Sequence, residues 1–340
     1  MSGAGGGGRG MAEANARAVT AARPALGARV RKGMRTFSRQ AWLQAFVLAG
    51  MAFFLLFRYV PMFGILIAFK DYDVYKGLPG FFTGRWAGLQ YFAEFFRDPI
   101  CWRIIVNTLA MSGLKLVFVF PMPILLALVL NEVRNGPFKR VVQTVSYLPH
   151  FISWVVVSGM IFTLFNERTG VGYAVLRAAG ILKSGASLLA DAKSFLPVVV
   201  VSDVWKSMGW WAIIFLAAIS GVDQEIYEAA IIDGAGRLQR IWFITLPSIM
   251  GTILIVLILS LGNIMGGGLE GSNFDQAYLL GNYSNSSVSE ILQTYVLKMG
   301  IAQMRFSYAT AVGLFQSLIA LAMVFTSNAI SRRLSGYGLF

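Results

Sequence analysis

Residues 220–247 read SGVDQEIYEAAIIDGAGRLQRIWFITLP and lie between two long apolar runs of the chain. Ser220 with Asp223 three residues later resembles a capping box, which opens a helix. The apolar positions from Ile226 to Ile232 then fall near one face of that helix. The stretch therefore predicts a short amphipathic helix between two buried segments.

A second short helix follows a glycine corner. Gly234 and Gly236 interrupt the first helix, and the next apolar residues share one face until Pro247 helps to end the second helix. Two short helices that meet at a corner form a compact knob, which is able to seat in a groove of another protein.

The flanking sequence is too apolar for a soluble domain. Of the 340 residues, 56% are hydrophobic and only 13% are charged, and the mean hydropathy is +0.65, whereas about a quarter of the residues of a soluble domain are charged. Several apolar runs exceed the roughly 18 residues that indicate a spanning helix. We therefore expect an all-α, polytopic membrane protein with six transmembrane helices, at about 41–66, 104–130, 142–165, 197–219, 248–265 and 306–330.

Basic residues gather on one side of these spans. An even number of spans places both termini on that side, which the positive-inside rule makes the cytoplasm. The other side then holds three longer segments, 67–103, 166–196 and 266–305, which we expect to carry most of the irregular chain. The basic positions are Arg9, Arg17, Arg23, Arg29, Arg31, Lys32, Arg35 and Arg39, then Arg134, Lys139 and Arg140, then Arg237 and Arg240, then Arg332 and Arg333.

The ends of the chain have a different composition from the spans. Residues 1–40 are rich in Gly, Ala and Arg, which predicts a flexible basic cytoplasmic tail whose last part touches lipid headgroups. Residues 41–102 comprise the first transmembrane helix and an external loop, and residues 331–340 form a short cytoplasmic tail.

Composition also excludes several classes of function. The net charge is +13, but no basic domain with interleaved aromatic residues lies outside the spans, so we expect no nucleic-acid partner. Cys101 is the only cysteine and His150 the only histidine, which excludes a metal cluster of these residues and catalysis that needs two histidines. No phosphate-binding Gly-x-x-x-x-Gly-Lys-Ser/Thr loop occurs, so the chain itself does not bind ATP in that way.

The knob resembles a motif of a known family, the integral permease subunits of binding-protein-dependent ABC importers. The motif is Glu-Ala-Ala, two residues, Asp-Gly-Ala, and a spacer that ends in Leu-Pro. Its positions here are Glu228, Ala229, Ala230, Asp233, Gly234, Ala235, Gly236, Leu246 and Pro247.

The resemblance implies a role for each part of the assembly. Residues 103–330 would be the type I permease domain, and 220–247 would be the coupling loop that docks on an ATP-binding subunit. The family's complex also has a second permease subunit, two ATP-binding subunits and an external solute-binding protein. The chain would then be a transporter subunit without a cofactor of its own in the bacterial plasma (inner) membrane, ATP and Mg being bound by the partners.

Further segments resemble permeases for carbohydrate uptake, especially a subgroup that imports complex oligosaccharides and uronate polymers. These segments are 59–64 (YVPMFG), 107–109 (NTL), 148–154 (LPHFISW), 205–206 (WK) and 306–315 (FSYATAVGLF). The substrate they imply is an oligosaccharide or polysaccharide.

Polar and aromatic residues within the spans are candidates for a translocation pathway. Lys115 is costly at membrane depth, so it either faces the pathway or pairs with a polar group of another helix. Trp205 either stacks on a sugar ring or belongs to an interfacial belt. Asp203 and Lys206 are expected to pair with each other along one helix, and Gly266 to Gly268 to fray the end of the fifth span. The remaining pathway candidates are Asn107, Asn263, Tyr308 and Gln316.

Two other classes of protein compete with this interpretation. A secondary transporter driven by an ion gradient would need intramembrane carboxylates, and only Asp203 is available in the predicted spans. A membrane-embedded enzyme would need His, Cys or carboxylate clusters, which the spans lack.

Overall fold

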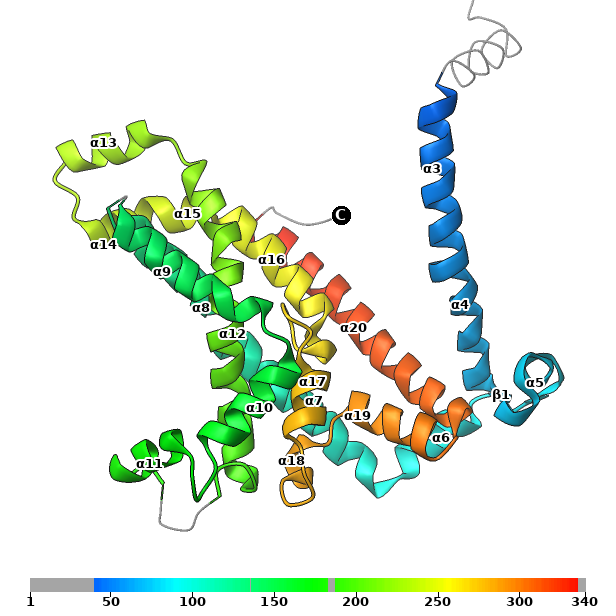
Figure 1. The fold of residues 1–340 in the computed structure, drawn as a ribbon. Helices are drawn as coiled ribbons and strands as arrows, with labels where there is room; N and C mark the ends of the chain where they lie inside the picture. The colour runs from blue at the N-terminus through cyan, green and yellow to red at the C-terminus, as the bar shows by residue number, and fades with distance from the viewer. Residues whose placement is uncertain (1–39, 135, 183–186, 336–340) are drawn as a thin grey trace, which may run out of the picture. The chain divides into compact units, whose positions relative to one another are not determined.

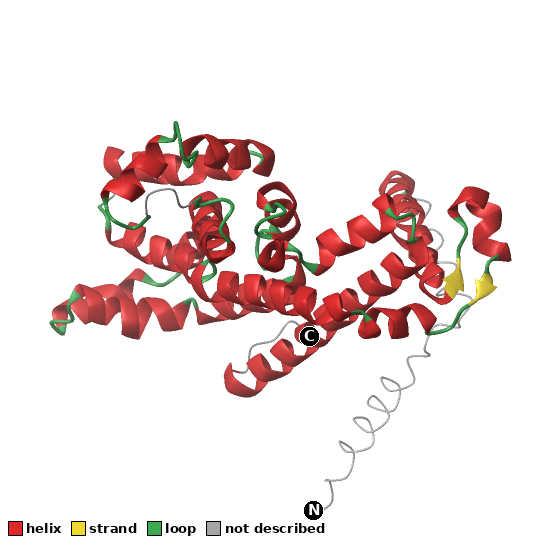
Figure 2. Ribbon diagram, turned by 90° about the horizontal axis from the view of Figure 1, so that it is seen from below, coloured by secondary structure: helices red, strands yellow, loops and turns green. Residues whose placement is uncertain are grey.

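The computed structural model describes residues 40–134, 136–182 and 187–335. The chain divides between Gly64 and Ile65 into two units, and each is described by itself. Helices dominate the described residues (Figure 2), and two short strands, β1 (Lys70–Asp71) and β2 (Arg85–Trp86), pair antiparallel. The all-α fold class is thus confirmed. The predicted tails, 1–40 and 331–340, lie mostly outside the described residues, but residues 331–335 belong to the last helix, which ends at Ser335.

The first unit contains one long apolar helical run. It comprises α3 (Ala41–Phe54), the π-helix η1 (Leu55–Tyr59) and α4 (Val60–Met62). No residue of these three elements is buried within the chain. A helix that is apolar on all sides is typical of a membrane span.

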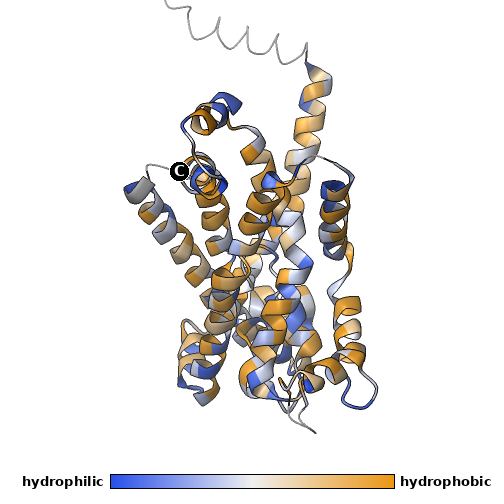
Figure 3. Ribbon diagram, turned by 90° about the vertical axis from the view of Figure 1, so that its left-hand side faces the viewer, coloured by the Kyte–Doolittle hydropathy of each residue, from blue (hydrophilic) through white to orange (hydrophobic). Residues whose placement is uncertain are grey.

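The helices long and apolar enough to cross a membrane match the six predicted runs. Four are continuous, and two are helix pairs bent at a short break. Their apolar residues cover most of the ribbon in Figure 3. The continuous helices are Ala41–Phe69, Pro99–Glu132, Ala192–Ser220 and Phe306–Arg333, and the bent pairs are Pro137–Phe151 with Trp154–Leu164 and Arg237–Ser248 with Met250–Gly262.

The second span is the central element of the larger unit. It comprises α7 (Pro99–Phe118) and α8 (Pro121–Glu132). The helix changes at Val119 and Phe120, because Pro121 has no backbone N–H to continue the helical hydrogen bonds. The fourth span, α12 (Ala192–Ser220), packs along α8 (Figure 1).

The third span is bent rather than straight. It comprises α9 (Pro137–Tyr147), the 3₁₀ turn η4 (Leu148–Phe151) and α10 (Trp154–Leu164), with a bend of 102° between the two arms. Ser153 is extended at the bend, and its hydroxyl caps α10 by accepting from the backbone N–H of Val156.

The fifth span begins inside the knob. Its elements are α14 (Arg237–Arg240), the π-helix η5 (Ile241–Thr245), α15 (Leu246–Ser248) and α16 (Met250–Gly262). The bend of 62° falls between α15 and α16. Pro247 lies inside α15, so the prediction that it helps to end the second helix of the knob is wrong by a residue or two.

The segment 266–305 is not the irregular external chain that we expected. It folds into short helices packed against the spans, with several fully buried polar residues, including Asn273, Gln276 and Asn285. Its elements are η6 (Ile264–Gly266), α17 (Asn273–Leu280), α18 (Ser286–Ser289), α19 (Leu292–Leu297) and η7 (Lys298–Ala302), and α20 (Phe306–Ser335) follows them.

The external segments carry the remaining helices. The expected external segment 67–103 is also largely helical, and it belongs to the larger unit, which begins at Ile65. The amphipathic α6 packs against α7 and α20. The elements are η2 (Phe63–Phe69), η3 (Val74–Lys76), α5 (Gly77–Thr83), α6 (Gln90–Arg97) and α11 (Val171–Ala178).

Candidate functional site: the knob and a buried ion pair

The first helix of the knob is α13 (Gln224–Ile232). Asp223 is its N-cap, and its carboxylate accepts a hydrogen bond of 3.0 Å from the backbone N–H of Glu225. Ser220 is the last residue of α12, and its hydroxyl donates back to the Leu216 carbonyl. The predicted capping box is therefore wrong: Asp223 alone caps the helix.

The glycine corner is a Schellman motif, which explains the Asp-Gly-Ala sequence physically. The N–H of Ala235 donates to the carbonyl of Ala230 at 2.8 Å, and that of Gly234 to Ile231 at 3.0 Å. Gly234 has a φ of +81°, the left-handed conformation that glycine adopts without steric cost. A Cβ at this position would meet no atom within 4 Å. Backbone conformation, not close packing, therefore requires the glycine.

The two arms of the knob are tied together by side chains. Gly236 precedes α14, and its N–H donates to the Gln239 side chain at 2.7 Å. The hydroxyls of Tyr227 and Thr245 lie 2.9 Å apart, which joins α13 to η5. Tyr227 was not singled out from the sequence, although it stands immediately before the Glu-Ala-Ala triplet. The corner is thus fixed at both ends.

The knob presents apolar side chains to its surroundings. Ile232 is 86% exposed and Phe243 is 78% exposed. Glu228 and Ala229 are also exposed, beside a half-buried Ala230. The exposed apolar residues of the knob are Ile226, Ile231, Ile232, Leu238, Trp242 and Phe243. Such a cluster is typical of a surface that another protein covers.

A hollow of about 290 Å³ lies beside the corner. Asp233, Gly234 and Ala235 line it from one side, and Arg240 and Phe243 from the other. The Nε atom of Arg240 is buried and has no hydrogen-bond partner among the described residues. The knob therefore offers both a projecting apolar surface and a polar recess, while Leu246 and Pro247 belong to the start of the fifth span.

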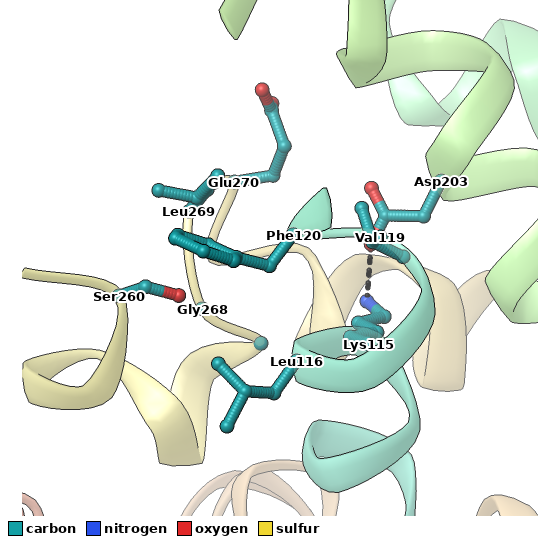
Figure 4. Close-up of a pocket in the computed structure, with 10 residues that line it drawn as sticks. Lys115, Leu116, Val119, Phe120, Asp203, Ser260, Gly268, Leu269 and Glu270 are labelled. Carbon is teal, nitrogen blue, oxygen red and sulfur yellow. Dashed lines mark ion pairs between the residues drawn. The ribbon is translucent and has the colours of Figure 1, made fainter. Parts of the chain in front are cut away.

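A second site lies inside the helix bundle, around Lys115 (Figure 4). The Lys115 ammonium on α7 lies 2.9 Å from the carboxylate of Asp203 on α12, and both side chains are at most 2% exposed. Ser272, just before α17, accepts from Lys115 at 2.7 Å and donates to Asp203 at 2.9 Å. Three segments that are distant in sequence are thus joined by one charged group and its partners.

This pair corrects the predicted pairing of Asp203 with Lys206. Lys206 instead donates to the His150 carbonyl at 2.7 Å and lies over the Trp154 ring. Asp203 lies well inside α12, which begins at Ala192. The carboxylate that a gradient-driven transporter would need is therefore already bound to Lys115.

The glycine-rich segment before Ser272 is buried, rather than frayed as expected. Gly267, Gly268 and Gly271 all have positive φ, which lets the chain turn sharply between α16 and α17. Glu270 accepts a hydrogen bond of 2.6 Å from the Trp211 indole. The Nδ1 atom of His150 lies 3.5 Å from the same carboxylate. The Trp211 side chain of α12 thus holds this segment in place.

The other pathway candidates occupy separate positions. Trp205 is 40% exposed and lines an apolar hollow of about 500 Å³ between α10, α11 and α12. Asn263 is exposed and donates to the Gly268 carbonyl at 2.9 Å. Gln316 is half-buried on α20. None of these three residues lines the pocket around Lys115 that Figure 4 shows, and their role in transport stays a prediction.

Asn107 and Tyr308 are buried among polar partners. Asn107 donates to the carbonyls of Ser287 and Glu290 at 2.9 and 3.0 Å. The hydroxyls of Tyr308 and Tyr295 lie 3.0 Å apart. Burial, reinforced by the hydrogen bond with Tyr308, raises the pKa of the Tyr295 phenol. Tyr295 therefore stays protonated and donates to Asp98 at 3.0 Å.

The described residues contain no group of three His, Cys, Asp or Glu side chains that could hold a metal ion. The knob presents an exposed apolar surface, and the bundle holds a buried ion pair.

Comparison with known proteins agrees with this geometry. The chain is 45% identical to protein LplB of Bacillus subtilis over 307 residues, which cover 90% of this chain and 93% of LplB. It is 41% identical over 302 residues to the polygalacturonan/rhamnogalacturonan transport system permease protein YteP of the same organism, covering 89% of this chain and 91% of YteP.

A solved structure has the same fold. It is a bacterial ABC transporter involved in the import of the acidic polysaccharide alginate. The TM-score is 0.80 at 36% identity, and the match covers 89% of this chain and 99% of the solved one. Residues 120–336 match the family described as the binding-protein-dependent transport system inner membrane component. With the motif at its knob, six candidate spans and this match, the chain belongs to the family of inner membrane components of binding-protein-dependent transport systems.

Proposed function

We propose that this chain is the permease subunit of an ATP-driven importer for an acidic oligosaccharide or polysaccharide, such as a uronate polymer, in a bacterial plasma membrane. The observation that carries the proposal is the likeness of nearly the whole chain to a permease of an alginate importer. The likeness to a permease for polygalacturonan, also a polymer of a sugar acid, supports the same substrate class.

The partners follow from the same family. A second permease subunit would complete the pathway, two ATP-binding subunits would bind ATP and Mg, and an external binding protein would deliver the substrate. A solved relative is in complex with a periplasmic protein that carries an alginate pentasaccharide, which supports the last of these. The permease itself would then need no cofactor.

The knob supplies the mechanical connection in this proposal. Its exposed apolar residues would be covered by an ATP-binding subunit. When the ATPases close, the knob moves with them, and the spans shift between inward-open and outward-open states. The loaded binding protein favours the outward-open state from the other face.

Uptake of a uronate oligosaccharide by the complete complex in proteoliposomes tests the proposal. We expect uptake to require internal ATP and the binding protein, and to survive an ionophore that dissipates ion gradients. Uptake that is abolished by the ionophore and does not depend on ATP would mean gradient-driven transport instead.

The contribution of the knob is tested by Glu228→Lys. The carboxylate is exposed on α13, so charge reversal should leave insertion unchanged while weakening docking of the ATPase and abolishing most uptake. Glu167→Lys, an exposed carboxylate outside the spans and the knob, is the matched control. If the Glu228→Lys variant is expressed and takes up substrate at the parental level, Glu228 is not part of the docking surface.

A further inference from the structure

A hollow of about 640 Å³ opens among α17, α18, α19 and η7. These elements lie at the end of the larger unit opposite α13 and the knob (Figure 1). Since the knob is cytoplasmic by the positive-inside rule, the hollow is external. Its volume falls within the range of small-molecule sites, about 300–1,000 Å³. It is therefore large enough to hold part of an oligosaccharide.

Two tyrosines stand at this hollow. Tyr278 is 59% exposed and stacks on Phe274, with the ring centroids 5.5 Å apart and the planes at 11°. Tyr283 is 97% exposed at the tip of a polar loop. A tyrosine has an apolar ring face and a hydroxyl that hydrogen-bonds. A sugar ring, which has an apolar face and a rim of hydroxyls, complements both features.

The positive and negative charges at the hollow do not balance. The Glu290 carboxylate, 14% exposed, lies 3.2 Å from the Lys298 ammonium and 3.4 Å from the Arg103 guanidinium. Two cations thus share one carboxylate, which leaves an excess of one positive charge. Lys298 lines the hollow and its side chain is 56% exposed. It can therefore bind a second carboxylate without leaving Glu290 unpaired.

The walls of the hollow are held in place by amides. The Asn107 amide donates hydrogen bonds to the carbonyls of Ser287 and Glu290. Asn285 is fully buried and donates to the carbonyls of Leu189 and Leu280. A site whose walls are fixed before binding loses less entropy when the ligand arrives.

We propose that this hollow binds a segment of an acidic oligosaccharide at the external mouth of the permease, with Lys298 taking a sugar carboxylate and Tyr283 and Tyr278 taking the ring faces. The inference rests on the proposed function and names the residues that would receive the substrate before it enters the spans.

Protection from labelling tests the site directly. Ile301 is 59% exposed and lines the hollow, so Ile301→Cys in the assembled complex should react with a membrane-impermeant maleimide. The parent chain gives the background, because its single cysteine, Cys101, is buried. We expect a uronate pentasaccharide to slow the labelling, and a neutral pentasaccharide to do so only at much higher concentration.

The charge is tested on the same Ile301→Cys background. Adding Lys298→Gln should raise the protecting concentration of the uronate pentasaccharide by about tenfold or more, the loss typical of a hydrogen bond between charged groups. Lys76→Gln is the matched control, since Lys76 is also exposed and paired with a carboxylate, that of Asp73, away from the hollow. We expect it to leave protection unchanged.

Three outcomes would overturn the site. They are unslowed labelling, equal protection by neutral and acidic sugars, and protection by the sugar-free binding protein alone, which would make the hollow a protein-docking surface. Failure of the proposed function is distinguishable, because then the parent complex takes up no uronate oligosaccharide even with ATP and the binding protein.

Discussion

Lys115 and Asp203 show how much one buried charge constrains this protein. Removing one partner of a buried ion pair leaves the other charge uncompensated, which typically costs about 3–5 kcal/mol. We therefore expect Lys115→Met to lower the amount of folded protein, whatever the substrate. Lys115→Met combined with Asp203→Leu should recover much of it, because both charges are then gone. The yield of protein after detergent extraction and size-exclusion chromatography measures the amount of folded protein.

The same variants separate structure from transport. Lys115→Arg keeps the charge and should retain more folded protein than Lys115→Met. A Lys115→Met protein that folds at the parental level but takes up no substrate would assign Lys115 to the pathway instead.

Gly234 is the second position where a single residue decides the local structure. A residue other than glycine in the left-handed region costs about 1–2 kcal/mol, and a β-branched residue resists it further. We expect Gly234→Ala to weaken capture of the ATP-binding subunit in a pull-down, and Gly234→Val to weaken it more. Gly113→Ala, in a helix with open space around it, is the control. Equal capture by the Ala and Val variants would mean that the corner does not set the docking geometry.

At the scale of elements, the close crossing of α9 and α12 depends on Gly209. A Cβ added there would lie 2.0 Å from the Ser146 carbonyl oxygen, which is backbone and cannot move aside. We expect Gly209→Ala to lower the melting temperature of the purified protein, although alanine normally stabilises a helix interior. Gly159→Ala, which meets no atom within 4 Å, should leave the melting temperature unchanged or raise it. An equal change in melting temperature for both variants would contradict the close crossing of α9 and α12.

The elements themselves were largely predictable. Runs of apolar residues longer than a soluble helix indicate spans regardless of neighbours, and each of the six runs has a helical counterpart, four of them continuous helices and two of them bent pairs. The bend at Ser153 was not predictable, because Pro149 marks a turn without giving its angle. The segment 266–305 was misjudged, because its polar residues are buried by partners on α7 and α12 that sequence proximity does not reveal.

At the scale of the whole molecule, the knob and the external hollow lie at opposite ends of the larger unit, and the Lys115–Asp203 pair lies inside the bundle. The knob has a sequence motif with fixed spacing, so its residues could be named in advance. The partner of Lys115 could not be named in advance, because Asp203 lies 88 positions away in the sequence. Lys206, at helical spacing from Asp203, is a nearer candidate partner for that carboxylate. Local patterns predict local contacts, and long-range pairing requires the fold.

Cysteine labelling tests this arrangement across the membrane. Ile232 on the knob and Tyr283 near the external hollow are 86% and 97% exposed. In intact cells, an impermeant maleimide should label Tyr283→Cys and leave Ile232→Cys unlabelled until the cells are opened. Labelling of Ile232→Cys in intact cells would contradict the proposed topology, which places the knob in the cytoplasm.

The bend in the third span has a consequence for the order in which the chain folds. The carbonyl of His150 receives its hydrogen bond from Lys206, which is 56 residues further along the chain. During synthesis, α9, η4 and α10 therefore emerge before the group that satisfies their bend exists. In hydrocarbon an unpaired carbonyl is costly. We therefore expect the third span to reach its native shape only after the fourth has been made.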